Sequence, residues 1–471
     1  MVGIWLLPKV AWGAEAIDVH REYRWPPDVG AELAAVEQLR MEQVGQWISE
    51  HEARGDGLER LYLLLALASS RYVDHHGPYI GHGTFNGGPM LRASSILLPT
   101  YRNLALRQTV AYVIELIDNP NYGPYLLMDM SPYRAEHPSN PDGEFLEALE
   151  SGNQPLRTEH RLVAMLQDMG VQRVRTILTE AGLRQFRDNE HRLLIVHRAA
   201  QFLDDVCGWD SWGEPILRPS IQYLATAPKP ALLNPGALSH VQATQGLANV
   251  DVVAKAVDRL ISVPYGDEPE ILREMAQRQI SGINLYEAVS LTGSRLLAQS
   301  GFDAHAVTGI HCVLDILKSS EDPRLVGLAW SVALSGQRTR RQKERRNDWR
   351  RLPDADATVE NLDDFVHVIR NDPSGLRAFA RTAGALQSGT SAQMVARTLM
   401  EVSLTTSDPF TAIHNVKMIW GQLIETQRSE CSELAWMHLA AGAVAVAQSV
   451  AENATQPIPV VDLWKETALS D

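Results

Sequence analysis

Cysteine is scarce in this chain of 471 residues, which contains only three, Cys207, Cys312 and Cys431. Their wide spacing excludes both a disulfide framework and the paired Cys-x-x-Cys pattern of a structural zinc site. We interpret them as core thiols of a protein kept in a reducing compartment, so we expect a cytoplasmic location.

Long apolar runs and positive charge are also lacking. No apolar run is long enough to span a bilayer, and the sequence therefore predicts no transmembrane helix. Residues 1–16 are apolar, but they have no basic start and are interrupted by Pro8 and Lys9, which argues against a secretory signal peptide. Because the formal net charge is −14 at pH 7, we expect neither nucleic acid nor a membrane as a partner.

Strand signals are few, because no run of alternating β-branched residues is bounded by hairpin turns. Helical periodicity dominates instead, and it predicts an all-α fold. The expected helices cover residues 31–51, 58–72, 105–117, 161–181, 191–206, 250–263, 268–299, 304–318, 325–335, 363–369, 391–404, 414–426 and 432–451. No repeat of fixed period is present, so we expect a single large globular helical array over residues 1–471.

Three stretches are predicted to be irregular: 74–99 and 128–155, both rich in proline, and 338–353. The third contains eight Lys or Arg residues between Arg338 and Arg351. We interpret it as a solvated loop on an acidic protein, with an anion-binding or partner-binding loop as the alternative.

Histidine is comparatively plentiful, with 15 in the chain. Four local groups stand out: His75, His76 and His82; His191 and His197; His305 and His311; and His414 with Lys417. Residues three apart share a helix face, so His414 and Lys417 can point at one site. Residues six apart are roughly 120° out of alignment, so we expect one histidine of each middle pair to face that site. The sequence leaves open which histidines of the first group converge.

The repetition of these groups predicts a metal site. A helical array can bring four such segments to one centre, as bundle metal sites do, and imidazole binds Fe, Cu, Ni and Zn alike. Lys417 is unusual because it lies in the apolar segment 410–423. Four interpretations remain open for it: a neutral amine, an ion pair with a carboxylate, a carbamate formed with CO2, or an ammonium that reaches the surface.

Three motifs carry a family resemblance. They are His-x-Leu-Leu-Ile-x-His from His191, Phe-x-x-His-Ala-Val-Thr-x-x-His around His305, and His-x-Val-Lys-Met from His414. In this order they resemble the questin oxidase-like family, over the chain from about Asp74 onward. The resemblance implies a helical oxidoreductase that opens or oxidises a ring of polycyclic aromatic polyketides such as anthraquinones. It also implies non-haem Fe(II), O2 as co-substrate and a small aromatic substrate.

The same resemblance implies the site residues. The metal ligands are expected among seven residues: His76, His82, His191, His197, His305, His414 and Lys417. Lys417 is the expected carboxylated lysine, and it and His305 are the expected catalytic residues. One departure from the family occurs at Phe-Asn-Gly-Gly-Pro-Met, where Gly87 replaces a histidine of the relatives. His75, His76 or His82 would then have to supply that ligand.

Three other functions stay open. The first is a Baeyer–Villiger-type monooxygenase that uses NADPH, although no Gly-x-Gly-x-x-Gly motif follows a strand. The second is a hydrolase with two metal ions bridged by a carboxylated lysine. The third is a non-enzymatic helical scaffold that uses the basic segment Arg338 to Arg351 for docking.

Overall fold

Helix boundaries follow local capping signals. In the computed structural model, helix α20 (Pro409–Arg428) begins after Asp408. The Asp408 carboxylate accepts hydrogen bonds from the backbone N–H groups of Phe410, at 3.2 Å, and Thr411, at 3.1 Å. This cap satisfies donors that the first helical turn leaves unpaired, and Pro409 occupies the position where a missing N–H costs nothing.

The structure describes residues 23–70, 72–73, 82–118, 123–124, 127, 140–152, 155–206, 208–300, 304–345 and 362–453. The first helices along the chain are α1 (Pro27–Gln38), α2 (Val44–Arg54), α3 (Leu58–Ser70), α4 (His82–Ser94), α5 (Pro99–Asp118), α6 (Pro141–Glu150), α7 (Pro155–Asp168), α8 (Val171–Gln185), α9 (His191–Asp205) and α10 (Trp209–Ala225). They are followed by α11 (Val250–Ser262), α12 (Glu268–Gln277), α13 (Gly282–Ser300), α14 (Ala304–Ser319), α15 (Pro323–Val332), α16 (Gln337–Arg345), α17 (Leu362–Arg370), α18 (Leu376–Gln387), α19 (Ala392–Leu404), α20 and α21 (Ser432–Asn453).

The predicted all-α class is confirmed. The one sheet among the described residues is an antiparallel pair of two-residue strands, β1 (Tyr72–Val73) and β2 (Gly123–Pro124). The rest of that part of the chain forms helices and their connections, packed as one array around a continuous apolar core. A β-pair of this length contributes little to the fold.

Three predicted helices are wrong in extent, because each is two helices in the structure. The segment 161–181 breaks at Gly170, whose φ is 76°, and 268–299 breaks near Gln279, whose φ is 63°. The segment 31–51 is interrupted by a short 3₁₀ helix at Met41–Gln43. Apolar periodicity continues across each break, so it predicts the buried face but not the turn.

The predicted irregular stretches are also partly wrong. Helix α4 lies within 74–99, α6 within 128–155, and most of α16 within 338–353. In α4, a Cβ added at Gly88 would lie 3.6 Å from Cβ of Phe202 on α9. Packing of α4 against α9 offsets the low helix propensity of the segment.

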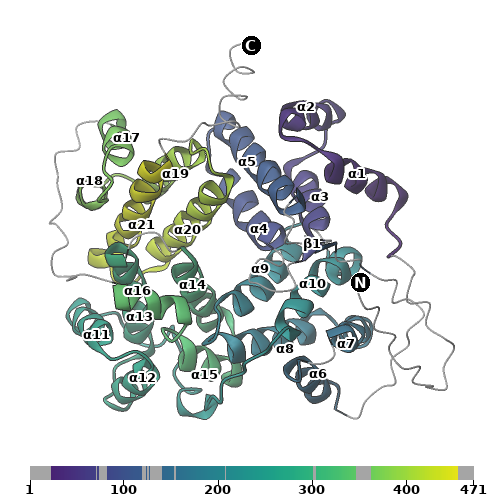
Figure 1. The fold of residues 1–471 in the computed structure, drawn as a ribbon. Helices are drawn as coiled ribbons and strands as arrows, with labels where there is room; N and C mark the ends of the chain where they lie inside the picture. The colour runs from purple at the N-terminus through teal and green to yellow at the C-terminus, as the bar shows by residue number, and fades with distance from the viewer. Residues whose placement is uncertain are drawn as a thin grey trace, which may run out of the picture.

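Four helices occupy the middle of the array. Figure 1 shows α4, α9, α14 and α20 grouped there, with the other helices arranged around them. Each of the four packs against two others in the order α4, α9, α14, α20 and back to α4. They are the helices that contain His82, His191, His305 and His414, so we call them the inner bundle.

Successive helices of the inner bundle run parallel from α4 to α20, because two contacts in each pair advance in the same direction along both helices. The contacts are Gly88 with Phe202 and Arg92 with Asp205, Glu190 with Gly309 and His197 with Asp315, and His311 with Glu425 and Asp315 with Arg428. The four helices therefore run in the same direction but are staggered, because the start of α9 lies beside the middle of α14 and the middle of α14 lies beside the last turn of α20.

Helix α21 packs directly against α20. It is the helix of the described residues that is long and apolar enough to cross a membrane, but 78% of its apolar window is buried inside the protein. We therefore interpret α21 as a core helix that packs against α20.

Candidate functional site

Helix α20 carries an unusual buried polar face. His414, Lys417, Gly421, Glu425 and Arg428 follow one another at intervals of three or four residues, so they lie on one side of the helix. His414 and Lys417 are both 0% exposed. Full burial of a lysine is rare and needs a compensating interaction. The interpretation of Lys417 as an ammonium that reaches the surface is therefore wrong.

Contacts on three sides hold the His414 ring. Its Nδ1 lies 2.7 Å from the backbone carbonyl oxygen of Phe410, one turn earlier. The Phe410 ring stacks on the imidazole with centroids 3.9 Å apart, and Tyr112 of α5 meets it edge-on at 6.4 Å. Because the carbonyl can only accept, Nδ1 carries the proton and Nε2 carries the lone pair.

His191 is held in the same way. It opens α9, is 1% exposed, and its Nδ1 lies 2.8 Å from Oδ1 of Asn189. We assign the amide oxygen as the acceptor, which again places the lone pair on Nε2. The preceding residue, Glu190, fixes the start of α9 by accepting hydrogen bonds from the backbone N–H groups of Arg338, at 2.9 Å, and Thr339, at 3.0 Å.

This pattern of hydrogen bonds fits a metal ligand. Metal-binding histidines characteristically donate their other ring N–H to a carbonyl or carboxylate, which orients the ring and raises its basicity. His191 and His414 both have that arrangement on helices of the inner bundle. The donor set is nitrogen-rich, and a carbamate on Lys417 would add oxygen, a mixture that suits a transition metal such as iron.

The other predicted ligands are placed less completely. His82 is the first residue of α4 and His305 the second of α14, but their side chains lie outside the described part of the structure. His75 and His76 lie outside the described residues altogether. The expectation that glycine and proline would exclude a helix at His82 is wrong, because α4 begins there.

His197 lies on another face of α9, as its spacing from His191 predicts. Its Nε2 lies 3.0 Å from Oδ2 of Asp315 on α14. The same carboxylate accepts from Gln201 Nε2 at 2.7 Å and pairs with Arg428 of α20 at 2.7 Å. Burial opposes the charge of Asp315, but the bond and charge of His197 outweigh it, and the pKa of this carboxyl lies well below its usual range. His197 as a metal ligand stays a prediction.

Glu425 is the centre of a second buried group. Its carboxylate contacts Nδ1 of His311 at 2.6 Å and accepts from the hydroxyls of Tyr286, at 2.9 Å, and Ser290, at 3.2 Å. Burial disfavours the charge, but the contact with His311 outweighs it and lowers the pKa of Glu425. Gly421 lies beside this group, where an added Cβ would be in ordinary van der Waals contact with His311, 3.6 Å from its Cγ.

Cys312 of α14 lies near both Arg198 of α9 and Lys417 of α20. Its thiol hydrogen-bonds with Arg198 of α9 and lies within electrostatic range of Lys417. Burial raises the pKa of the thiol to about 11, against the opposing effect of the neighbouring Arg198. Cys312 is therefore a neutral core thiol, as predicted, and the same holds for the buried Cys431.

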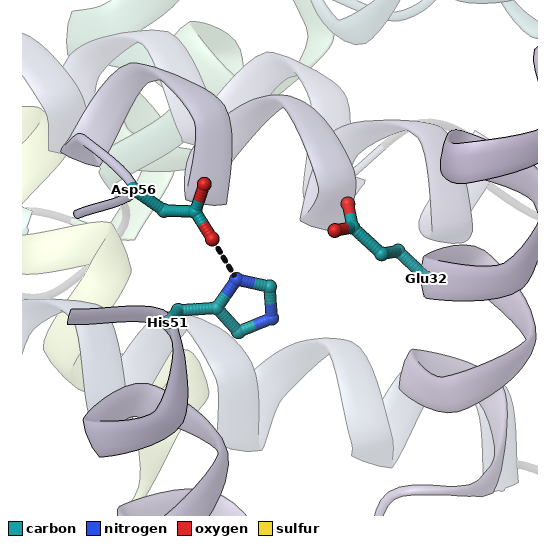
Figure 2. A group of neighbouring side chains, drawn as sticks. All are labelled: Glu32, His51 and Asp56. Atoms are coloured by element: carbon teal, nitrogen blue, oxygen red, sulfur yellow. Dashed lines mark hydrogen bonds and ion pairs between the residues drawn. The ribbon is translucent and has the colours of Figure 1, made fainter. Parts of the chain in front are cut away.

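A further cluster of possible ligands lies elsewhere, on α1 and around the end of α2. Figure 2 shows Glu32, His51 and Asp56, whose ligand atoms lie within 4.8 Å of one another. His51 Nδ1 already contacts Asp56 at 2.7 Å. Arg60 pairs with Glu32 at 2.7 Å, and Arg54 lies 3.5 Å from it. Because these guanidinium groups compete with any cation, we interpret the cluster as ion pairs that hold α1 to its neighbours.

The basic segment from Arg338 is only partly a surface loop. Its first residues form α16, in which Lys343 pairs with Glu268 at 3.1 Å and Arg340 lies over the ring of Tyr265 at 4.2 Å. Residues 346–361 lie outside the described part of the chain. The expectation of a loop is therefore wrong for residues 338–345, which are helical. Lys343 and Arg340 have partners within the protein, although Arg340 and Arg341 are exposed to solvent.

Comparisons with models of protein families, with curated proteins and with solved structures found no match to this chain. The resemblance to the questin oxidase-like family stays a prediction that depends on the three motifs.

Sequence reasoning missed two polar residues of the inner bundle, Arg198 on α9 and Asn86 on α4. Arg198 is 2% exposed and Asn86 1%. A signal was present for each, since Arg198 follows His191 by seven residues and Asn86 follows His82 by four, the spacings that keep side chains on one helix face.

Proposed function

We propose that this protein is a metal-dependent oxygenase that acts on a polycyclic aromatic substrate, with non-haem iron in the inner bundle. The observation that carries the proposal is the matched pair His191 and His414. Each imidazole is buried, each binds an oxygen through Nδ1, and each directs its lone pair to Nε2. Lys417 lies one turn after His414 on the same face of α20.

The proposed ligands are His82, His191, His305, His414 and carboxylated Lys417. Carboxylation forms a C–N bond between CO2 and the neutral amine of Lys417, and it releases one proton. Burial favours the reaction because a buried amine prefers its neutral form. The product replaces a neutral amine with an anion, which is the charge that a divalent metal needs beside it.

Bound ferrous iron would supply the activation of O2, and the chain would supply binding and orientation. Phe410 and Tyr112 fix the ring of His414, and Asn189 fixes that of His191. The bundle excludes water, which strengthens electrostatic interactions inside it. The substrate class, an aromatic polyketide such as an anthraquinone, is supported by the motif resemblance.

Metal analysis of the full chain tests this proposal. The protein is prepared anaerobically with Fe(II) and bicarbonate, as wild type, as Lys417→Ala and as Lys255→Ala, which changes an exposed lysine of α11. We expect stoichiometric iron in the wild type and in Lys255→Ala, and loss of iron from Lys417→Ala. Circular dichroism shows whether the Lys417→Ala variant is folded.

Two outcomes contradict the proposal. Full iron retention in folded Lys417→Ala would remove Lys417 from the centre. A wild-type protein that takes up no metal under these conditions would favour the scaffold interpretation, in which the histidines only pack. Preparing the wild type without bicarbonate separates a carbamate from a plain lysine, because only a carbamate makes iron uptake depend on CO2.

A further inference from the structure

Arg198 is a buried cation without an anionic partner among the described residues. Its side chain is among the largest fully buried ones of the protein. Its hydrogen bonds go to neutral groups, Oε1 of Gln201 at 2.6 Å from Nη1 and the thiol of Cys312. Within the described part of the chain, its Nε and Nη2 have no hydrogen-bond partner. The guanidinium also forms no ion pair with any carboxylate there.

Arg218 shows how this protein normally buries a guanidinium. It is 0% exposed, yet its Nε pairs with Glu159 at 2.8 Å and its Nη1 with Glu214 at 3.0 Å. Asp315, the carboxylate that accepts from the same Gln201 that contacts Arg198, is itself bound by His197, Gln201 and Arg428. A buried charge without a counter-charge is expensive. Because no carboxylate of the described residues pairs with Arg198, an anion supplied from outside the chain would offset this cost.

The surroundings of Arg198 favour an anion. Arg198 lies seven residues after His191, so both point from the same face of α9. Its neighbour Cys312 lies within electrostatic range of Lys417, a second buried side chain of basic character.

A second polar group of the bundle also has no partner. Both side-chain atoms of Asn86, Nδ2 and Oδ1, are buried and make no hydrogen bond within the described residues. The next residue, Gly87, lies close to the ring of Phe202, which follows Arg198 by one turn of α9. Native proteins rarely leave such groups unsatisfied, and a bound molecule or ion often supplies the missing hydrogen bonds.

We propose that Arg198 binds the oxyanion of a small molecule, a carboxylate or an ionised phenol, held inside the inner bundle. Guanidinium presents paired N–H donors whose planar geometry matches two oxygens of a carboxylate, and it also binds a single phenolate oxygen. Arg198 is not a proposed metal ligand, so the inference does not depend on iron and goes beyond the proposed function.

Matched acidic and neutral probes test the site in the full chain as purified. Calorimetry compares benzoate with benzamide, and 4-nitrophenolate with 4-nitroanisole, on the wild type and on Arg198→Met. We expect the wild type to bind at least one anion more tightly than its neutral analogue. Loss of a charge-assisted hydrogen bond should weaken that anion by on the order of tenfold to a hundredfold in Arg198→Met and leave the neutral analogue unchanged.

Stability measurements separate this site from a structural role. Arg198→Met removes an unpaired cation, so without probe it should be as stable as the wild type or more stable. Arg218→Met, the matched control, removes the buried guanidinium that pairs with the buried Glu159 and with Glu214, and it should be clearly less stable. Iron content should be unchanged in Arg198→Met, so failure of the metal proposal and failure of this one are distinguishable.

Three results would overturn the inference. One is that the wild type binds the acidic and neutral probes equally tightly, or binds none of the probes. Another is undiminished anion binding by Arg198→Met, as expected if the probes bound elsewhere. The last is a loss of stability in Arg198→Met comparable to that of Arg218→Met, which would assign Arg198 a partner within the protein.

Discussion

The burial of His438 should make the stability of this protein depend on pH. His438 lies on α21, is 0% exposed, and its Nδ1 contacts the hydroxyl of Ser294 at 2.7 Å. Burial lowers its pKa from 6.5 to about 4, and the opposing charge of Glu425 offsets only part of that effect. The folded protein therefore keeps this imidazole neutral at pH values where the unfolded chain protonates it.

The sign and size follow from proton linkage. Between pH 6.5 and about 4 the unfolded state binds a proton that the folded state does not, so the free energy of unfolding falls as the pH falls. The contribution is fully present above pH 6.5. Its complete loss corresponds to roughly 3 kcal/mol, and about 1.4 kcal/mol of this is lost by about pH 5.5.

Urea unfolding at about pH 7 and about pH 5.5 measures this effect. In His438→Gln, the difference between the free energies of unfolding at the two pH values should be smaller than in wild type by about 1.4 kcal/mol. His160, whose pKa burial lowers to about 4, contributes in the same direction but is present in both proteins. Substitution of the exposed His240 by Gln is the control. Equal pH dependence in wild type and His438→Gln would refute the reasoning.

Two further predictions concern packing and unsatisfied polar groups. Gly327→Ala should lower the free energy of unfolding by about 3 kcal/mol or more, because its Cβ would lie 1.9 Å from the carbonyl oxygen of Pro235. Gly213→Ala is the control and should be neutral or slightly stabilising, because its nearest neighbours would lie at 3.8 Å. Equal denaturation midpoints for the two variants would contradict this prediction. Asn86→Leu should not lower the stability of the unliganded protein, because the amide has no partner among the described residues. Asn415→Leu, which loses a 2.8 Å bond to Ser449, should lower it by about 1 kcal/mol, and a similar loss in Asn86→Leu would assign that amide a structural role.

Long apolar periodicity predicted many of the helices well. The expected helix 191–206 is α9 within one residue, and 250–263 is α11 within one residue. Helix α10 was missed because it contains Pro215 and Pro219, which normally interrupt helices. Both prolines are buried in the structure, so packing that no local pattern reveals offsets their cost.

The candidate site also has features that the sequence predicts and features that it does not. The face shared by His414 and Lys417 follows from their spacing and could be predicted. The bond of His414 to the carbonyl of Phe410 needed the rotamer of the side chain, which the sequence does not specify. The pairing of His197 with Asp315 crosses 118 residues, and no local signal in one sequence connects such positions.

The inner bundle is formed by segments that are far apart in the sequence and are therefore synthesised at different times. Its neighbouring helices are connected by side-chain bonds across 113, 118 and 114 residues, at Arg92 to Asp205, His197 to Asp315 and His311 to Glu425. A bond from the backbone N–H of Leu98, just after α4, to Glu401 on α19 spans 303 residues.

In a nascent chain, the polar groups of α4 and α9 that are buried in the folded protein therefore stay exposed until α20 has been synthesised. Contacts of such sequence separation slow folding and prolong the exposure of apolar surface. We expect that a chain ending before α20 cannot form the centre at all, and that production of the protein depends on chaperones during synthesis.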